Sequence, residues 1–162
     1  MSKSSQLPQY VSDLIALYGN DYGILLGSAV FYDIVDPDTD LEQIALRCQR
    51  QFLGPKWFDP QQEDWLGGWL LLYRRPDGQT GDIVKEFEAV YDIFERILHR
   101  FLDPLKSGDE AIAREKLAIA FDDPDVRDLH IYEMDDQDIL TGRLVIGRRS
   151  NGETTTLIIV CD

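Results

Sequence analysis

The spacing of apolar side chains changes along the chain from a helical period to a strand period. As far as residue 121, most apolar residues recur at steps of three or four, the spacing of one helix face. This pattern predicts helices over residues 8–18, 40–53, 82–102 and 109–121. Beyond it, shorter apolar runs predict strands over residues 129–134, 139–148 and 154–161. The order of elements therefore predicts an α+β fold, with helices packed on a largely antiparallel sheet.

The longest predicted helix, Asp82–Leu102, has the most regular apolar stripe. Its anchors follow one another at steps of 4, 3, 4, 3 and 4: Ile83, Phe87, Val90, Phe94, Ile97 and Phe101. Each such side chain contributes roughly 1.5–3 kcal/mol when it is fully buried. We therefore expect this helix to be the spine of the hydrophobic core.

Turn signals separate the predicted strands. Residues 150–153 read Ser-Asn-Gly-Glu, and Asn-Gly favours the positive φ angles of a type I′ hairpin turn. We therefore expect the chain to end in a three-stranded antiparallel meander. A further short strand is predicted over residues 69–73, before a turn at Pro76-Asp77-Gly78.

Two further segments complete the expected order of elements. Residues 22–35 are almost entirely apolar, and we expect a buried strand, although periodicity alone does not separate it from a buried helix. Thr39 is the expected N-cap of the next helix, because Glu42 completes a capping box. Gly54-Pro55 predicts the end of that helix, and a loop is expected from there to residue 64.

Length and composition favour one domain over residues 1–162, with residues 1–6 as a flexible tail. The net charge of −14 and the pI near 4.4 argue against nucleic acid or an anionic membrane as the ligand, because phosphate binding requires Lys and Arg. No apolar run is long enough to span a membrane, and the first residues lack the apolar segment of a signal peptide. Cys48 and Cys161 share no metal or redox spacing, so we expect a cytoplasmic location.

Half of the net charge falls in one short segment. Arg127 is the single base there, among eight acids: Asp122, Asp123, Asp125, Asp128, Glu133, Asp135, Asp136 and Asp138. The segment therefore carries −7 of the total of −14. Such a cluster raises the rate at which a basic partner associates. The alternative is that the acids only keep the protein soluble.

Aromatic side chains gather beside another group of acids. Trp57, Phe58, Trp65 and Trp69 are interspersed with Asp59, Glu63 and Asp64. Such aromatic residues are usually part of a core, but Trp is also favoured at binding hot spots. Because Gly67-Gly68 follows, we expect Trp65 to be exposed, which makes Asp64 and Trp65 candidate partner-binding residues.

The sequence shows no motif for a catalytic or metal site. Residues 36–47 begin like a calcium loop, but Leu41 replaces its Gly and Arg47 replaces its bidentate Glu. His99 and His130 are the only histidines, and neither belongs to a Cys- or His-based metal motif. No phosphate loop, nucleophile elbow or paired cysteine motif is present. We therefore expect no catalytic residue, no cofactor and no structural metal.

Three features resemble the nuclease A inhibitor family of cyanobacteria. They are Pro60-Gln-Gln-Glu-Asp-Trp65, which is similar to a Pro-Gln-Asp-Trp loop of that family, the helix over residues 82–102, and the terminal hairpin with its Thr-rich last strand. The resemblance covers residues 60–102 and 129–162. It implies an α-β-α sandwich and a small acidic cytosolic protein that blocks a sugar-nonspecific nuclease.

The resemblance also implies partner-binding positions. The family uses its Trp loop and a terminal Thr that reaches the metal of the nuclease, and the corresponding positions here are Trp65 and Asp162. The chain departs from the family at its last residue, by two extra residues in the loop, and by helix 109–121, which has no clear equivalent there. The carboxylates of Asp162 can still ligate a divalent ion.

The leading hypothesis is a non-enzymatic acidic domain that binds a basic protein, with a basic nuclease as the candidate. Its predicted contacts are Asp64, Trp65, Asp122, Asp123, Asp125, Asp128, Asp135, Asp136, Asp138 and Asp162. The alternative is a small acidic chaperone or an immunity-type partner protein that acts through an exposed sheet or helix face. A third hypothesis, from another class, is an enzyme with a carboxylate-only metal site drawn from residues 33–40 and 122–138.

Overall fold

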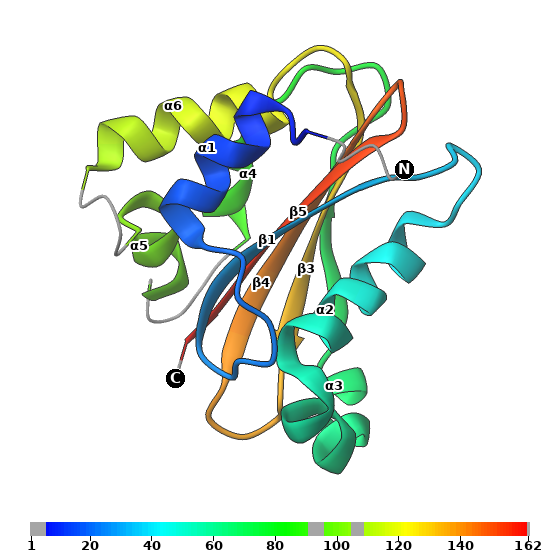
Figure 1. Cartoon of the computed structure of the whole chain (residues 1–162), viewed down its shortest axis with the longest axis vertical. Coiled ribbons are helices and arrows are strands. Elements are labelled where there is room, and N and C mark those ends of the chain that lie inside the picture. Colours follow the sequence, from blue (N-terminus) through cyan, green and yellow to red (C-terminus); the bar gives the residue numbers. More distant parts are fainter. Residues whose placement is uncertain (1–5, 91–95, 105–108, 162) are drawn as a thin grey trace.

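The computed structural model describes residues 6–90, 96–104 and 109–161 (Figure 1). Within these ranges, five strands form one antiparallel sheet in the order β1-β5-β4-β3-β2. The strands are β1 (Gly27–Ile34), β2 (Leu70–Arg74), β3 (Val126–Asp135), β4 (Thr141–Arg149) and β5 (Glu153–Cys161). The predicted α+β class and the C-terminal meander are confirmed.

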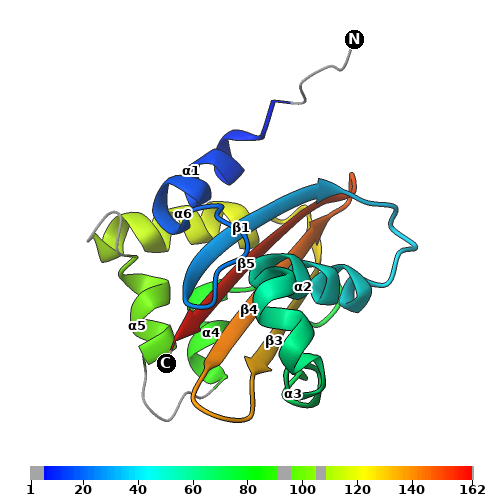
Figure 2. The ribbon, with the colours of Figure 1, turned by 60° about the horizontal axis from the view of Figure 1, so that its bottom comes forward.

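Helices cover both faces of the sheet, so the fold has three layers (Figures 1 and 2). One face packs against α1 (Gln9–Tyr18), α4 (Ile83–Ala89), α5 (Arg96–Leu102) and α6 (Glu110–Phe121). The other packs against α2 (Leu41–Phe58) and α3 (Gln62–Gly67), which are joined by the 3-10 helix η1 (Asp59–Gln61). In the described part of the chain, no helix has both the length and the apolar character needed to cross a bilayer.

Alternation along the strands supplies both helical layers with apolar side chains. In β3, Leu129 and Ile131 join the core beneath α1 and α6, whereas Tyr132 and Met134 join the core beneath α2. The neighbouring strands β4 and β5 are central, and their residues are buried on both faces. Both strands therefore contain continuous apolar runs in place of an alternating pattern.

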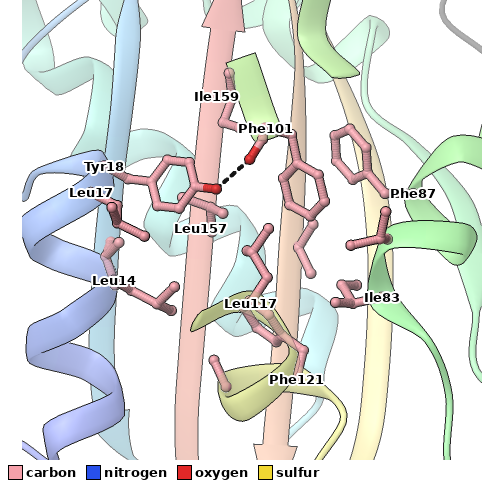
Figure 3. Packing of buried hydrophobic residues seen from close by; sticks show 14 of the residues in the cluster. Leu14, Leu17, Tyr18, Ile83, Phe87, Phe101, Leu117, Phe121, Leu157 and Ile159 are labelled. Atoms are coloured by element: carbon pink, nitrogen blue, oxygen red, sulfur yellow. Dashed lines mark hydrogen bonds between the residues drawn. The ribbon is translucent and has the colours of Figure 1, made fainter. Parts of the chain in front are cut away.

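The single helix predicted over Asp82–Leu102 is wrong. α4 ends at Ala89, because Val90 has φ −90° and ψ 89°, and α5 begins at Arg96. The predicted anchor Phe94 lies outside the described residues. Along one helix, the Cα atoms of Phe87 and Phe101 would be about 21 Å apart. Their rings instead stack with centroids 3.8 Å apart, because two short helices bring them onto one core (Figure 3).

The helix that follows β1 also differs from its prediction. Its N-cap is Asp40 and not Thr39, since the Asp40 carboxylate accepts a hydrogen bond from the Glu42 N–H at 3.0 Å. Gly54 interrupts the helix with φ 71°, but Pro55 then starts a new helical turn. The loop expected after Gly54 is therefore wrong, because the chain continues through the end of α2, η1 and α3.

Two smaller corrections concern β1 and the last hairpin. β1 begins at Gly27, five residues later than the predicted strand, and it lies at a sheet edge. In the hairpin, Gly152 N–H donates to the Arg149 carbonyl at 2.9 Å, and Gly152 is the residue with positive φ, at 91°. The Asn-Gly pair therefore closes a turn of the type I kind followed by a glycine bulge, in place of the expected type I′ turn.

Candidate functional site

The acidic segment from Asp122 to Asp138 does not form one face. β3 spans Val126–Asp135, a length of about 30 Å at the usual rise per residue. Asp122, Asp123, Asp125 and Asp128 lie at or near the start of this strand, and Asp135, Asp136 and Asp138 lie at its far end. The cluster predicted from the sequence is therefore divided into two groups, because residues along a strand lie progressively further apart.

Acids at the start of β3 are held by basic residues of the same fold. Asp123 pairs with Arg149 at 3.4 Å and Asp128 with Arg148 at 3.1 Å. The Asp125 carboxylate accepts a hydrogen bond from the Ser150 hydroxyl. These contacts fasten the entry of β3 to the β4–β5 hairpin, so much of this charge is neutralised within the protein.

Asp122 belongs to a more deeply buried group centred on Arg75. The Arg75 guanidinium pairs with Glu86 at 2.5 Å and with Asp122 at 3.1 Å, and it donates to the Phe121 carbonyl at 2.7 Å. Asp122 also accepts a hydrogen bond from the Ile83 N–H at 2.8 Å. Burial nevertheless raises the pKa of Asp122 to about 6, because its effect outweighs the hydrogen bond from Ile83 and the charge of Arg75, which both lower the pKa. The group links α4, α6 and the end of β2.

At the other end of β3, Asp136 has a structural role. Its side chain is only 7% exposed, and its carboxylate accepts hydrogen bonds from the N–H groups of Asp138 at 2.9 Å and Leu140 at 3.0 Å. Asp135 accepts from the Gln137 N–H in the same loop. Asp136 therefore shapes the β3–β4 loop, and the exposed Asp138 is the acid that faces solvent there.

The β3–β4 loop also contacts α3, a segment distant from it in the sequence. The Gln137 side chain donates from Nε2 to the Asp64 carbonyl at 3.0 Å, so α3 contacts the β3–β4 loop (Figures 1 and 2). The contact needs glycine, because a Cβ at Gly68 would lie 2.1 Å from the backbone oxygen of Asp135. The structure thus brings Asp64 together with Asp135 and Asp138.

Trp65 is not exposed, and this expectation is wrong. Its side chain is 0% exposed and packs in the core that includes Tyr132 and Met134. Trp69, nearby in sequence, stacks on Tyr132 with ring centroids 4.5 Å apart. The glycines after Trp65 allow the β3–β4 loop to approach; they do not free the indole ring.

Exposed apolar side chains are the part of this region that the sequence analysis missed. Ile139 in the β3–β4 loop is 68% exposed, and Leu66 is exposed at the end of α3, the helix that contacts this loop. We name the acidic-apolar surface from its members: Glu63, Asp64, Leu66, Asp135, Asp138 and Ile139. The sequence analysis made Ile139 the first residue of the strand predicted over residues 139–148, whereas β4 begins at Thr141 and leaves Ile139 in the loop.

The remaining candidate positions are the chain end, the potential metal ligands and the turn over residues 36–40. Asp162 lies outside the described residues. Among residues 6–90, 96–104 and 109–161, no three His, Cys, Asp or Glu side chains gather as metal ligands would. Residues 36–40 form a turn and a helix cap, in which Asp36 accepts a hydrogen bond from the Asp38 N–H.

His130 lies on the α2 side of the sheet. Its Nδ1 is 2.8 Å from the Tyr132 hydroxyl, and burial, with Arg74 nearby, lowers the pKa of His130. Burial also raises the pKa of Tyr132. Both groups are therefore neutral near pH 7, and the pair acts as a hydrogen-bonded part of the sheet.

Comparison of the chain with protein-family models, with curated proteins and with solved structures finds no match.

Proposed function

We propose that this chain is a non-enzymatic, acidic protein-binding domain and that a basic partner docks on the acidic-apolar surface. The observation that supports the proposal most is the hydrogen bond from Gln137 to the Asp64 carbonyl. It holds two segments of the chain together and places acids and exposed apolar side chains from both on one surface.

The chemistry of this surface defines the partner. Glu63, Asp64 and Asp138 are exposed, whereas several acids at the start of β3 are paired with arginines. Unpaired acids attract Lys and Arg during encounter, and apolar side chains such as Ile139 are buried once contact is made. A basic protein with an apolar patch therefore fits better than a purely ionic ligand.

Within this class we propose a basic nuclease as the partner, on the resemblance to nuclease A inhibitors. A nuclease holds phosphates with Lys and Arg, and acids on α3 and the β3–β4 loop would meet the same groups. The apolar anchor would be Ile139, since Trp65 is buried. The encounter is proposed for the cytoplasm, in keeping with Cys48 and Cys161, neither of which is in a disulfide.

The test uses a purified basic, sugar-nonspecific nuclease and three forms of the protein. The surface variant carries Glu63→Gln, Asp64→Asn and Asp138→Asn. The control carries Asp38→Asn, Asp77→Asn and Glu115→Gln, which remove the same charge from exposed positions elsewhere. We expect the parent and the control to inhibit the nuclease, and the surface variant to bind about tenfold more weakly.

Two results decide between forms of the proposal. If the parent binds the nuclease without inhibiting it, a chaperone or an immunity-type partner replaces the inhibitor. If both triple variants weaken binding equally, the acidic-apolar surface is not the docking site. Ile139→Ser separates the apolar contribution, because it removes the side chain without changing charge.

A further inference from the structure

A cavity of about 480 Å³ lies at the end of β5, where Cys161 pairs with Thr141 at the start of β4. Its apolar lining comes from α1, from the connection to β1, and from β5, and includes Leu17, Ile24, Leu26, Ile159 and Val160. This volume is within the roughly 300–1,000 Å³ of small-molecule sites. The cavity is therefore large enough for a small ligand with an apolar body.

One wall of the cavity is fixed by backbone contacts. Val30 N–H donates to the Gly19 carbonyl and Ile24 N–H donates to the Phe52 carbonyl, both at 2.9 Å. A Cβ at Gly54 would lie 3.0 Å from the Cα of Gly23, so the connection from α1 to β1 packs tightly on the bend of α2. The wall is thus formed before any ligand arrives.

Tyr18 holds in position the side of the cavity that faces the hydrophobic core. Its hydroxyl donates across β5 to the Phe101 carbonyl of α5, as Figure 3 shows, and its own carbonyl accepts from the Ser28 hydroxyl at 2.7 Å. The contact ties α1 to α5 where both line the cavity. The polar groups of this side are therefore satisfied within the protein.

Arg100 is the cationic group of the lining. It lies in the last turn of α5 and is exposed, and its guanidinium forms no hydrogen bond or ion pair with the described residues. Asp21 also lines the cavity, at the connection between α1 and β1. An arginine that is not neutralised, beside apolar walls, is suited to a carboxylate carried by an apolar body.

We propose that this cavity binds a small monocarboxylate with an apolar chain, with its carboxylate on Arg100 and its chain against Ile24, Leu26 and Ile159. The net charge of −14 repels anions at long range. Binding of a carboxylate therefore requires a local cation and cannot arise from general electrostatic attraction.

Cys161 provides a direct readout of occupancy. It lines the cavity and is half-buried, whereas Cys48 is buried elsewhere and burial raises the pKa of its thiol to about 11. The probe is decanoate, below its micelle concentration, and the neutral control is 1-decanol. The rate of Cys161 alkylation is followed by mass spectrometry, with Cys48 as the internal reference.

We expect decanoate to slow Cys161 alkylation in a saturable way, with 1-decanol requiring at least about tenfold higher concentration. Arg100→Gln should weaken protection by decanoate about tenfold and leave the effect of 1-decanol unchanged. Arg127→Gln, which removes an exposed cation from β3, should change neither. Asp21→Asn should strengthen decanoate binding about two- to fivefold by removing a like charge.

Two kinds of outcome would overturn the proposal. One is the absence of saturable protection by decanoate in the parent protein. The other is equal protection by decanoate and 1-decanol, or protection that Arg100→Gln leaves intact, since Arg100 would then not recognise the carboxylate. Because Arg100 is exposed and forms no hydrogen bond or ion pair within the described part of the chain, circular dichroism should show that its variant folds like the parent.

Discussion

Two adjacent arginines, Arg74 and Arg75, show that the surroundings of a residue decide how much it contributes to the stability of the fold. The Arg75 side chain is 3% exposed and contacts two carboxylates and a backbone carbonyl. The Arg74 side chain is 60% exposed and lies 3.8 Å from Asp77 at the surface. The sequence does not show which of the two arginines is buried, because the bulge between Leu71 and Tyr73 shifts the alternation of inward and outward side chains along β2.

Replacing Arg75 is expected to destabilise the fold strongly. Arg75→Met keeps the apolar stem but leaves Glu86 and Asp122 without their cation, so we expect a loss of about 3–5 kcal/mol in the free energy of unfolding. The matched control, Arg74→Met, should cost about 1 kcal/mol or less. Urea titrations of both variants provide the measurement. Equal losses for the two would mean that the buried pairing contributes little.

Asp122 is expected to make stability fall as the pH rises from about 4 to about 6. Its pKa is about 6 in the fold, above the ordinary 3.8, so the folded state holds a proton that the unfolded chain has released. This difference corresponds to about 3 kcal/mol before solvent screening, and we expect about 1–2 kcal/mol at this half-buried carboxylate.

The pH effect is measured against Asp122→Asn, which cannot ionise. Between pH 4 and pH 7, the stability of the parent relative to this variant should decrease by the expected amount. A relative increase over the same interval would show that the ion pair with Arg75 outweighs the cost of burial.

At the scale of elements, the sequence pattern predicted which residues are buried better than it predicted where a helix is interrupted. The strands of the meander and α6 were predictable, because short runs and a regular period were bounded by turn residues. The break between α4 and α5 was not, since Phe87 and Phe101 meet in one core whether or not the backbone between them is helical.

The candidate site was harder to predict, because position in sequence is a poor guide to position on a strand. Asp122 and Asp138 are close in sequence but lie beyond opposite ends of β3, whereas Asp64 and Gln137 are distant in sequence and in contact. No local pattern encodes that contact. The same limit explains Trp65, whose glycine neighbours accommodate a loop from elsewhere in the chain.

The two glycines after α3 should differ in their tolerance of substitution. A Cβ at Gly68 meets the rigid backbone oxygen of Asp135 at 2.1 Å, whereas a Cβ at Gly67 meets the flexible end of the Gln137 side chain at the same distance. We expect Gly68→Ala to cost about 1–3 kcal/mol and to displace the β3–β4 loop. Gly67→Ala should cost less, because Gln137 can move aside.

Thermal unfolding compares the two glycine variants, and amide exchange of residues 135–140 reports the loop. Faster exchange there in Gly68→Ala, beyond that in Gly67→Ala, would agree with the proposed packing. A larger loss of stability in Gly67→Ala would contradict it.

At the scale of the whole molecule, acids occupy both ends of the sheet but are paired mainly at one. Surface charges further apart than about 8 Å are largely screened at physiological ionic strength, so the two ends act separately. For the binding test above, association with the nuclease should slow as salt rises, while dissociation changes little. The surface variant should associate more slowly and with a flatter salt dependence than its charge-matched control.

The position of β5 in the sheet has a consequence for how the chain folds. β1 pairs with β5 along its whole length, from Gly27 opposite Val160 to Ile34 opposite Glu153. During synthesis β1 emerges early, whereas its partner strand is made much later. Until then, the apolar residues Val30 and Phe31 of β1 are not packed in the sheet. Pairings so distant in sequence slow folding, because a long loop must close before they form. Assembly of the complete sheet therefore follows synthesis of β5, and a nascent chain that stalls before β5 leaves β1 without a partner strand and one edge of β4 unpaired.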